Sequence, residues 1–297
     1  MSNFLLIGLC VLGGILCRRI PGFPKDAHLG LNAFLIYVSL PAISLLYVPA
    51  LSLRLEMLYP FVSGLLVMGG SLAFFGLLRG QFDRLTVGCL MLVCGLGNTS
   101  FVGFPITETL YGSAGLQYAI FADQSAFLML ALVGISIAAV YSGNRLRVSQ
   151  VLGRILRFPP FWAFVVGLLM AVSGLRVPDL LDPVLRQLGG TLTPLALFSV
   201  GLQFKIGFQS LPWKALGLGL AYKLVLAPLL VWGLYVWLAP AGGLAIQVSV
   251  LESGMPPMVT ASIVATTYKL NPTLANLLVG VGLILAVPTL YGWWLWL

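Results

Sequence analysis

The sequence predicts an all-α membrane protein in which ten transmembrane helices form two inverted five-helix repeats, and three observations lead to this fold class. Of the 297 residues, 60% are hydrophobic and 8% are charged, whereas soluble domains carry about 25% charged residues. The apolar runs suit helices that cross a roughly 30 Å hydrocarbon core, because barrel strands would need only about 10 alternating residues each. Two of the runs, one in each half of the chain, are interrupted by polar residues and prolines.

Ten apolar segments follow one another along the chain. They cover residues 3–17, 29–49, 58–78, 86–111, 115–141, 158–174, 180–202, 213–238, 243–267 and 272–296. The first is interpreted as a transmembrane helix and not as a signal peptide, because no basic residue precedes it and Cys17, Arg18 and Arg19 make a poor cleavage site. The 34 glycines fit helices that pack closely in lipid, where small residues let backbones approach.

The net charge of +8 follows membrane topology and does not predict a nucleic-acid partner. Most basic residues fall in the connections after odd-numbered segments: Arg18, Arg19, Lys25, Arg79, Arg84, Arg145, Arg147, Arg154, Arg157, Lys205, Lys214 and Lys269. The connections after even-numbered segments contain Arg54, Arg176 and Arg186. Because positive charge marks the cytoplasmic side, the odd connections are expected inside and both termini outside.

The longest connection, residues 142–157, separates the two halves and carries four arginines. The residues on its apolar face are Val148, Val151, Leu152 and Ile155. This pattern predicts a basic amphipathic helix on the inner membrane surface. It divides the chain into a first repeat at residues 1–141 and a second at residues 158–297, each with five segments. Because five is odd, the second repeat enters the membrane upside down, which is a recurrent transporter architecture.

The two interrupted stretches are Gly95–Pro105 (GLGNTSFVGFP) and Leu251–Ser262 (LESGMPPMVTAS). Irregular backbone at membrane depth is tolerated only where it is buried in protein or lines a watery cavity. At about 1.5 Å per residue, Asn98 lies roughly 18 Å from the inner side and Glu252 roughly 14 Å from the outer side. The broken fourth and ninth helices would then cross near the midplane, and their half-helix N-termini would favour an anion. The alternative is that the prolines only kink continuous helices.

The residues at the two interruptions are the candidates for substrate binding. The set comprises Asn98, Thr99, Ser100, Phe101, Pro105, Ser253, Gly254, Met255, Pro256 and Pro257. Hydroxyl, amide and backbone N–H groups bind a carboxylate without a full buried charge, which suits a carrier that must release its cargo. Pro256 and Pro257 have no N–H and enforce the break. The alternative is that the Ser and Thr side chains only satisfy unwound backbone.

Four ionisable side chains fall at membrane depth, where charge is costly and is a functional candidate by default. They are Glu108, Asp123, Lys223 and Glu252. Asp123, with its neighbour Gln124, and Glu252 are predicted to serve a coupling ion or a proton, and Lys223 to balance their charge. The alternative is a structural ion pair. Glu108 lies nearer the outer end of its segment, where it can reach water.

The sequence does not predict an enzyme. Cys10, Cys17, Cys89 and Cys94 lie within apolar segments and are interpreted as reduced packing residues, and the single histidine, His28, lies in a connection. Neither a metal-ligand grouping nor a phosphate-binding loop is visible. We therefore expect no catalytic residue, no metal site and no cofactor.

The end of the last segment is rich in aromatic residues. They are Tyr291, Trp293, Trp294 and Trp296. Such amphipathic rings gather at the membrane–water interface, so these residues are predicted to form an interfacial belt and not a stacking site for a ligand.

Four runs of the sequence carry a resemblance to a known family. They are GNTSFVGFPITETLYG, FADQSAFL, LGGTLTPLALFSVGL and ESGMPPMVTASIVATTYKLNPTLANLLVGVG. They resemble the bacterial members of the auxin efflux carrier family, within the bile/arsenite/riboflavin transporter superfamily. The resemblance implies a sodium/proton antiporter-like fold with crossed, broken helices 4 and 9. It also implies an elevator movement of a transport domain (segments 3–5 and 8–10) against a scaffold (segments 1, 2, 6 and 7).

Members of that family carry small organic anions such as malonate, malate or indole-3-acetate. The expected function is therefore secondary transport of a mono- or dicarboxylate across the bacterial inner membrane by a multi-pass protein, with export as one direction. The alternatives are a sodium- or proton-coupled uptake symporter of the bile-acid type and an anion channel. The expected partners are the organic anion, the lipid bilayer, Na⁺ or H⁺ as a coupling ion, and a second copy bound through the scaffold.

Overall fold

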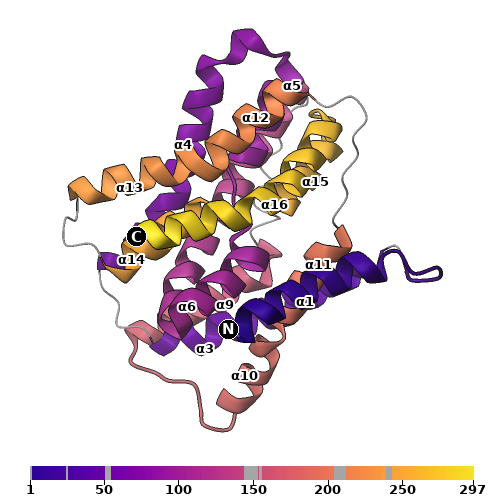
Figure 1. The fold of residues 1–297 in the computed structure, drawn as a ribbon. Coiled ribbons are helices and arrows are strands. Elements are labelled where there is room, and N and C mark those ends of the chain that lie inside the picture. Colours follow the sequence, from indigo (N-terminus) through magenta and orange to yellow (C-terminus); the bar gives the residue numbers. More distant parts are fainter. Residues whose placement is uncertain are drawn as a thin grey trace. The chain divides into compact units, whose positions relative to one another are not determined.

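The computed structural model describes residues 2–24, 26–50, 55–143, 153, 156–203, 212–238 and 243–297. Every regular element in this part of the chain is helical, as Figure 1 shows. The all-α prediction is therefore confirmed for the described residues. The chain forms two compact units: residues 1–55, 100–120 and 154–204 make the first, and residues 56–99, 121–153 and 205–297 make the second. Each unit draws on both halves of the sequence.

The first unit is a group of short helices. They are α1 (Ser2–Cys17), α2 (Ala27–Phe34), α3 (Leu40–Tyr47), α9 (Pro159–Val172), α10 (Asp182–Gly190) and α11 (Leu192–Gln203). α1 runs beside α11 (Figure 1), and α3 packs on α9 and α10. Gly14 of α1 and Gly201 of α11 face each other so closely that a Cβ on either would collide with the backbone of the other helix. Small residues therefore set this contact, as in helix pairs in lipid.

The second unit contains the longer helices. They are α4 (Leu58–Leu77), α5 (Arg84–Cys94), α7 (Ile135–Ser142), α12 (Trp213–Ala221), α13 (Ala227–Leu238), α14 (Leu244–Ser253), α15 (Val259–Thr267) and α16 (Pro272–Trp296). α4 packs on α5, α13 and α14, and α16 packs on α5 and α12. Side chains cap two of these helices: Asp83 Oδ1 accepts from the Thr86 N–H at 3.0 Å, and Asn271 Oδ1 accepts from the Leu274 N–H at 3.2 Å.

α6 (Phe104–Met129) runs from the first unit into the second. The backbone at Gly112 is not helical, with φ +66°, so the chain turns there. A side chain would be strained at this φ, and glycine avoids that strain. The structure thus separates the predicted segments 86–111 and 115–141 at Gly112.

π-helical turns interrupt several helices. In the described residues they are Leu35–Ser39, Thr99–Gly103, Leu130–Gly134 and Tyr222–Leu226. The first, second and fourth end two residues before a proline, at Pro41, Pro105 and Pro228. Proline has no N–H and its ring crowds the carbonyl four residues earlier, so widening the preceding turn relieves the clash.

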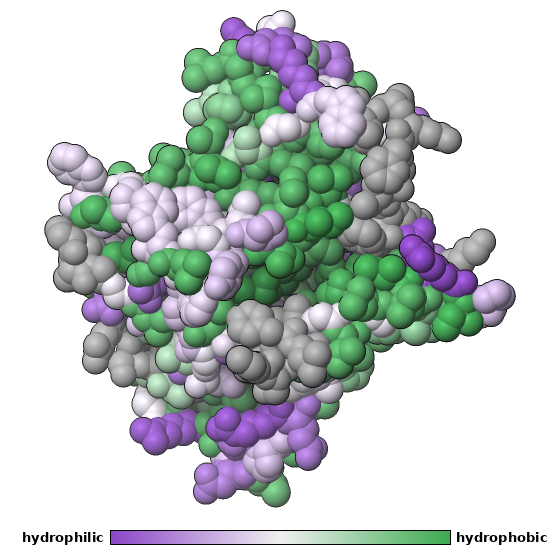
Figure 2. Space-filling model, viewed as in Figure 1, coloured by the Kyte–Doolittle hydropathy of each residue, from purple (hydrophilic) through white to green (hydrophobic). Residues whose placement is uncertain are grey.

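Five helical runs of the described residues are long and apolar enough to cross a membrane: Ala27–Ala50, Leu55–Leu77, Thr99–Ser142, Trp213–Trp237 and Pro272–Trp296. Shorter apolar helices cover Gly8–Cys17, Arg84–Cys94, Pro159–Val172 and Leu244–Ser253. Figure 2 shows hydrophilic residues where α4 meets α5 and near α10, and hydrophobic residues over the visible faces of α1 and α16. These features fit a multi-pass membrane protein, and the count of ten crossings stays a prediction.

Parts of the sequence predictions fall outside the described residues. The apolar face proposed for the connection between the halves, Val148, Val151, Leu152 and Ile155, is among them, with Arg145, Arg147 and Arg154. Lys25, Arg54 and Lys205 of the charge pattern are outside as well. The repeat boundaries at 141 and 158 stay predictions.

Candidate functional site

Two helices of the second unit break off at the predicted interruptions. α5 ends at Cys94 and the helical path resumes at Thr99, and α14 ends at Ser253 and α15 begins at Val259. We call residues 95–98 and 254–258 the paired breaks, because they lie side by side. The Asn98 N–H donates to the Pro256 carbonyl at 2.8 Å, and the Met258 N–H donates to the Leu96 carbonyl at 3.1 Å. Both helices therefore end at these segments, and the prolines do more than kink continuous helices.

The composition of the paired breaks explains their shape. Gly97 lies opposite Pro257 in an isolated antiparallel bridge. A Cβ on Gly97 would lie 3.2 Å from Lys223 Nζ and 3.3 Å from the Glu252 carbonyl oxygen, so glycine at residue 97 lets the two segments approach without crowding. Pro256 and Pro257 offer no N–H to continue α14 or to begin α15. The backbone hydrogen bonds lost by the helices are replaced across the breaks.

Buried ionisable side chains surround the paired breaks. Asp123, Lys223 and Glu252 are 3%, 1% and 2% exposed. Lys223 Nζ donates to the carbonyl of Ser253, the last residue of α14, at 2.5 Å, and Thr99 Oγ1 donates to Asp123 Oδ1 at 2.6 Å. Buried charge requires partners of this kind. Lys223 and the carbonyl end of α14 therefore satisfy each other, as do Asp123 and the Thr99 hydroxyl.

A small cavity is lined by Lys223 and Glu252 and by Thr99, the partner of Asp123. Its lining residues are Ser63, Gly64, Val67, Gly95, Gly97, Thr99, Ala122, Ala126, Lys223, Glu252 and Ser253. It offers about 20 Å³ to the centres of water-sized molecules, and roughly 10–15 Å³ on that measure holds one water. The cavity has room for a water or a small inorganic ion and is too small for a carboxylic acid.

The structure brings most of the predicted residues together. Asn98, Thr99, Asp123, Lys223, Glu252 and residues 253–257 all belong to the second unit around the paired breaks. Gln124 follows Asp123 and is 2% exposed, and it does not line the cavity. Its Oε1 atom is buried, and no hydrogen-bond partner occurs among the described residues.

Four predicted residues belong to the first unit. Three of them, Ser100, Phe101 and Pro105, follow the break along the chain, and Phe101 is 9% exposed. The fourth, Glu108, is half-buried and accepts a hydrogen bond from Thr193 Oγ1 at 3.3 Å. None of the four lines the cavity.

Several lining residues were not predicted from the sequence. Ser63 and Val67 come from α4, and Ala122 and Ala126 come from α6. Each pair is spaced by four residues, which places both members on one face of a helix. Small and aliphatic residues at this spacing are common throughout the chain, so the sequence carried no signal that would distinguish them.

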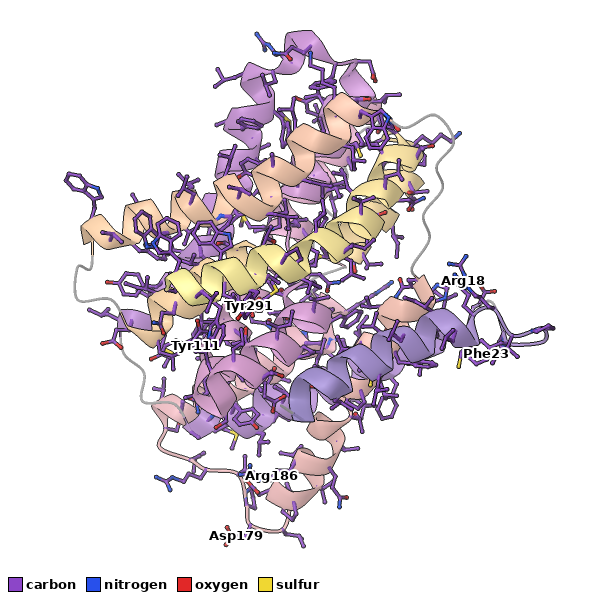
Figure 3. The ribbon with its side chains drawn as sticks, in the orientation of Figure 1. Arg18, Phe23, Tyr111, Asp179, Arg186 and Tyr291 are labelled. Atoms are coloured by element: carbon purple, nitrogen blue, oxygen red, sulfur yellow. The ribbon has the colours of Figure 1, made fainter. Side chains whose placement is uncertain are left out.

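The aromatic belt prediction is wrong for Trp293. This residue is 7% exposed, and its Nε1 atom donates to the Leu224 carbonyl at 3.0 Å. Tyr291, labelled on α16 in Figure 3, and Trp296 are each 56% exposed and remain candidates for lipid contact. Successive residues of an α-helix point about 100° apart around its axis. Neighbouring aromatic residues of α16 therefore face different surroundings, and Trp293 points inward.

The cysteines all have free thiols. Cys89 and Cys94 are buried, and Cys10 and Cys17 are partly exposed. Within the described ranges no three His, Cys, Asp or Glu side chains are grouped as metal ligands.

Residues 2–294 match the family model described as membrane transport protein. The chain is similar to an uncharacterized transporter of Methanothermobacter thermautotrophicus, with 30% identity over 228 residues that cover 76% of this chain and 73% of the relative. It is also similar to an uncharacterized transporter of Methanocaldococcus jannaschii, with 28% identity over 314 residues that cover 99% of this chain and 98% of the relative.

Proposed function

Because the chain belongs to the membrane transport protein family, which is the auxin efflux carrier family that its motifs resemble, it is a membrane transporter, and we propose that it carries a small organic anion such as a mono- or dicarboxylate. The observation that supports this most is the meeting of two helix breaks around the buried Lys223 ammonium. Helix N-termini and a buried cation favour negative charge. The organic anion would bind as a carboxylate at the breaks, outside the small cavity that Lys223 lines.

The substrate and the coupling ion would use different atoms. The cavity is too small for an organic acid, so we assign it to Na⁺, to a water or to the water that carries H⁺. Asp123, Glu252 and Lys223 would then set the charge of that cavity. The Thr99 hydroxyl donates to Asp123. We therefore propose that Thr99 serves the coupling ion and not the substrate.

The carboxylate would bind to the groups of the breaks that do not serve the cavity. The side-chain amide of Asn98 would supply the donor, because the N–H groups of Gly254 and Met255 already donate within the end of α14. Ser100, Phe101 and Pro105 belong to the first unit, so their part in substrate binding stays a prediction from the sequence. These roles rest on the position of each residue along the breaks and on the preference of carboxylates for such donors.

The division into two compact units supports an elevator mechanism. The second unit contains the paired breaks, the cavity and the three buried charges. We propose that it forms most of the transport domain, segments 3–5 and 8–10, which moves within the membrane, and that segments 1, 2, 6 and 7, all in the first unit, are the scaffold. The proposal also includes ten transmembrane helices in two inverted repeats and both termini on the outer side. Two copies would associate through the scaffold.

A sodium- or proton-coupled uptake symporter is the second candidate, because Glu252 and Thr99, whose hydroxyl binds Asp123, line a cavity of ion size. The two candidates differ in direction and coupling and share the site. A channel fits less well, since its conduction needs a continuous polar path, whereas the polar groups here concentrate at the paired breaks.

The experiment combines ligand stabilisation with transport. Purified protein is heated with malonate, malate or indole-3-acetate while Na⁺ and pH are varied, and the same anions are tested for counterflow in proteoliposomes. A ligand at 100 times its Kd stabilises the folded state by about 2.7 kcal/mol. We expect one class of anion to raise Tm and to exchange across the membrane.

The matched variants are Glu252→Gln and Glu108→Gln, which remove one carboxylate from each unit. Glu252→Gln is expected to abolish the dependence of counterflow on Na⁺ or pH, and Glu108→Gln to preserve it. If no anion raises Tm under any condition and none exchanges, the proposed cargo class is wrong. Equal dependence in both variants would refute the role of Glu252.

A further inference from the structure

Three consecutive residues of one π-helical turn bind three different helices. The turn, Tyr222–Leu226, joins α12 to α13. Tyr222 Oη donates to the Val67 carbonyl of α4 at 2.5 Å, and Lys223 Nζ donates to the Ser253 carbonyl of α14 at 2.5 Å. The carbonyl of Leu224 accepts from Trp293 Nε1 of α16 at 3.0 Å. Tyr222, Lys223 and Leu224 are 3%, 1% and 2% exposed, so all three bonds are shielded from water.

Pro228 explains why the Leu224 carbonyl needs an outside donor. In an α-helix this carbonyl would accept from the N–H of residue 228, and proline has none. The proline ring also crowds the carbonyl four residues earlier and pushes it away from the helix. The turn widens, and the Ala227 N–H donates to the Tyr222 carbonyl in the π pattern. The indole N–H of Trp293 replaces the donor that Pro228 lacks.

Trp293 is itself held firmly. Its ring stacks on Trp296 with centroids 5.1 Å apart and an interplanar angle of 21°. Trp296 in turn lies 4.7 Å from Trp232 of α13. The last turns of α16 are therefore fixed against α13, and the indole donor has little freedom to leave Leu224.

The π-turn also borders the paired breaks. A Cβ on Gly254 would lie 3.4 Å from Pro228 Cγ, which is ordinary contact distance. Lys223 lines the cavity, with Glu252 and Ser253. A change in the path of the turn would rotate Lys223, because residues of an α-helix and of a π-turn differ in their angular spacing.

We propose that Trp293 is a positioning residue for Lys223. Its N–H holds the Leu224 carbonyl, the held carbonyl keeps the π-turn, and the π-turn directs the Lys223 ammonium to the end of α14. The inference rests on the proposed function only in giving Lys223 a role in transport. The positioning itself concerns contacts within the second unit and is testable without a ligand.

The test is hydrogen–deuterium exchange of the purified full chain, read by mass spectrometry. Trp293→Phe keeps an aromatic ring and removes the donor, and Trp294→Phe is the matched control on the same helix. Trp293→Phe is expected to speed exchange about fivefold in peptides that contain residues 222–227, the factor for one lost hydrogen bond. Peptides that contain residues 252–258 should also exchange faster, and Trp294→Phe should change neither.

A double-variant cycle separates positioning from a general structural role. Lys223→Met removes the ammonium and is expected to speed exchange at residues 252–258 by itself. In that background Trp293→Phe should still speed exchange at residues 222–227 and add nothing at residues 252–258, because Lys223 is the link. If the effect at 252–258 persists without Lys223, or never occurs, Trp293 does not position Lys223.

Pro228→Ala supplies a second test that does not depend on the folding of Trp293→Phe. It restores an N–H at residue 228, so the turn can become α-helical and the Leu224 carbonyl no longer needs the indole. Exchange at residues 252–258 should rise in Pro228→Ala, and adding Trp293→Phe should change exchange at 222–227 less than twofold. Unchanged exchange at 252–258 in Pro228→Ala would overturn the inference.

Counterflow of radiolabelled malonate in proteoliposomes connects the positioning to transport. We expect Trp293→Phe to reduce the rate by no more than Lys223→Met does, to add no further loss in the Lys223→Met background, and Trp294→Phe to preserve the rate. If the parent chain moves no malonate while the exchange pattern appears as described, malonate is not its cargo and the positioning still holds. If malonate moves and Trp293→Phe exchanges it at the parent rate, the positioning has no part in transport and the proposal fails.

Discussion

Thr99→Val should weaken the second unit by removing one buried hydrogen bond. The hydroxyl of Thr99 donates to Asp123 Oδ1 at 2.6 Å, and the two residues are 4% and 3% exposed. Valine keeps the shape of threonine, so the change isolates the bond. A hydrogen bond to a charged group contributes about 1.5–3 kcal/mol, and one between neutral groups about 1 kcal/mol. We expect a loss of about 2 kcal/mol if Asp123 is ionised.

The assay is thermal unfolding followed by tryptophan fluorescence. One kcal/mol shifts Tm by roughly 2–4 °C in chains somewhat smaller than this one, so Thr99→Val should lower Tm by about 4–8 °C. Thr99→Ser keeps the hydroxyl and should remain near the parent. Thr109→Val is the control, because the Thr109 hydroxyl donates to the Pro105 carbonyl of its own helix at 2.7 Å. The reasoning is refuted if Thr99→Val and Thr109→Val melt within about 1 °C of each other.

Three further substitutions test other contacts by the same measurement. Gly97→Ala places a methyl group 3.2 Å from Lys223 Nζ, so it should lower the stability by about 1–3 kcal/mol and slow counterflow. An unchanged counterflow rate would mean that transport does not need the close approach of the two breaks. Gly14→Ala pushes α1 off the α11 backbone, with a similar expected cost and little change in the pH dependence of counterflow. Asp83→Ala removes a helix cap and should cost about 1 kcal/mol at neutral pH. The Thr86 hydroxyl and amide lower the pKa of Asp83 below its ordinary value despite opposing desolvation. The stability difference between parent and Asp83→Ala should therefore be full above about pH 4 and shrink as pH falls through the lowered pKa. A stability difference that grows in acid would contradict this assignment.

The relation between prolines and π-turns is a local rule that the sequence could have supplied. Pro41, Pro105 and Pro228 each follow a π-turn by two residues. The turn Leu130–Gly134 has no such proline, and Pro288 lies inside α16 with no π-turn before it, so among the described residues proline is neither necessary nor sufficient for the turn. A proline inside a helix still leaves the carbonyl four residues earlier without its N–H donor, and for Pro228 the structure identifies Trp293 as the replacement.

The family resemblance and the local breaks were both readable in the sequence. Gly95, Gly97, Pro256 and Pro257 interrupt apolar runs, and glycine and proline are the residue types that disfavour a continuing helix most. Apolar length and low charge predicted helices in a membrane, because both follow from the hydrophobic thickness that must be crossed. The kink at Gly112 also lies between two segments that the sequence separated.

The tertiary structure alone decided which atoms meet. No local rule states that Asn98 binds the Pro256 carbonyl, that Thr99 binds Asp123 or that Trp293 faces inward. Such contacts join segments far apart in the chain, and they depend on how whole helices pack and rotate. The sequence by itself determined where the helices must break and which buried groups need partners, because backbone chemistry is local. The packing of the helices determined which donor meets which acceptor, because several polar side chains along the chain could have satisfied the same buried groups.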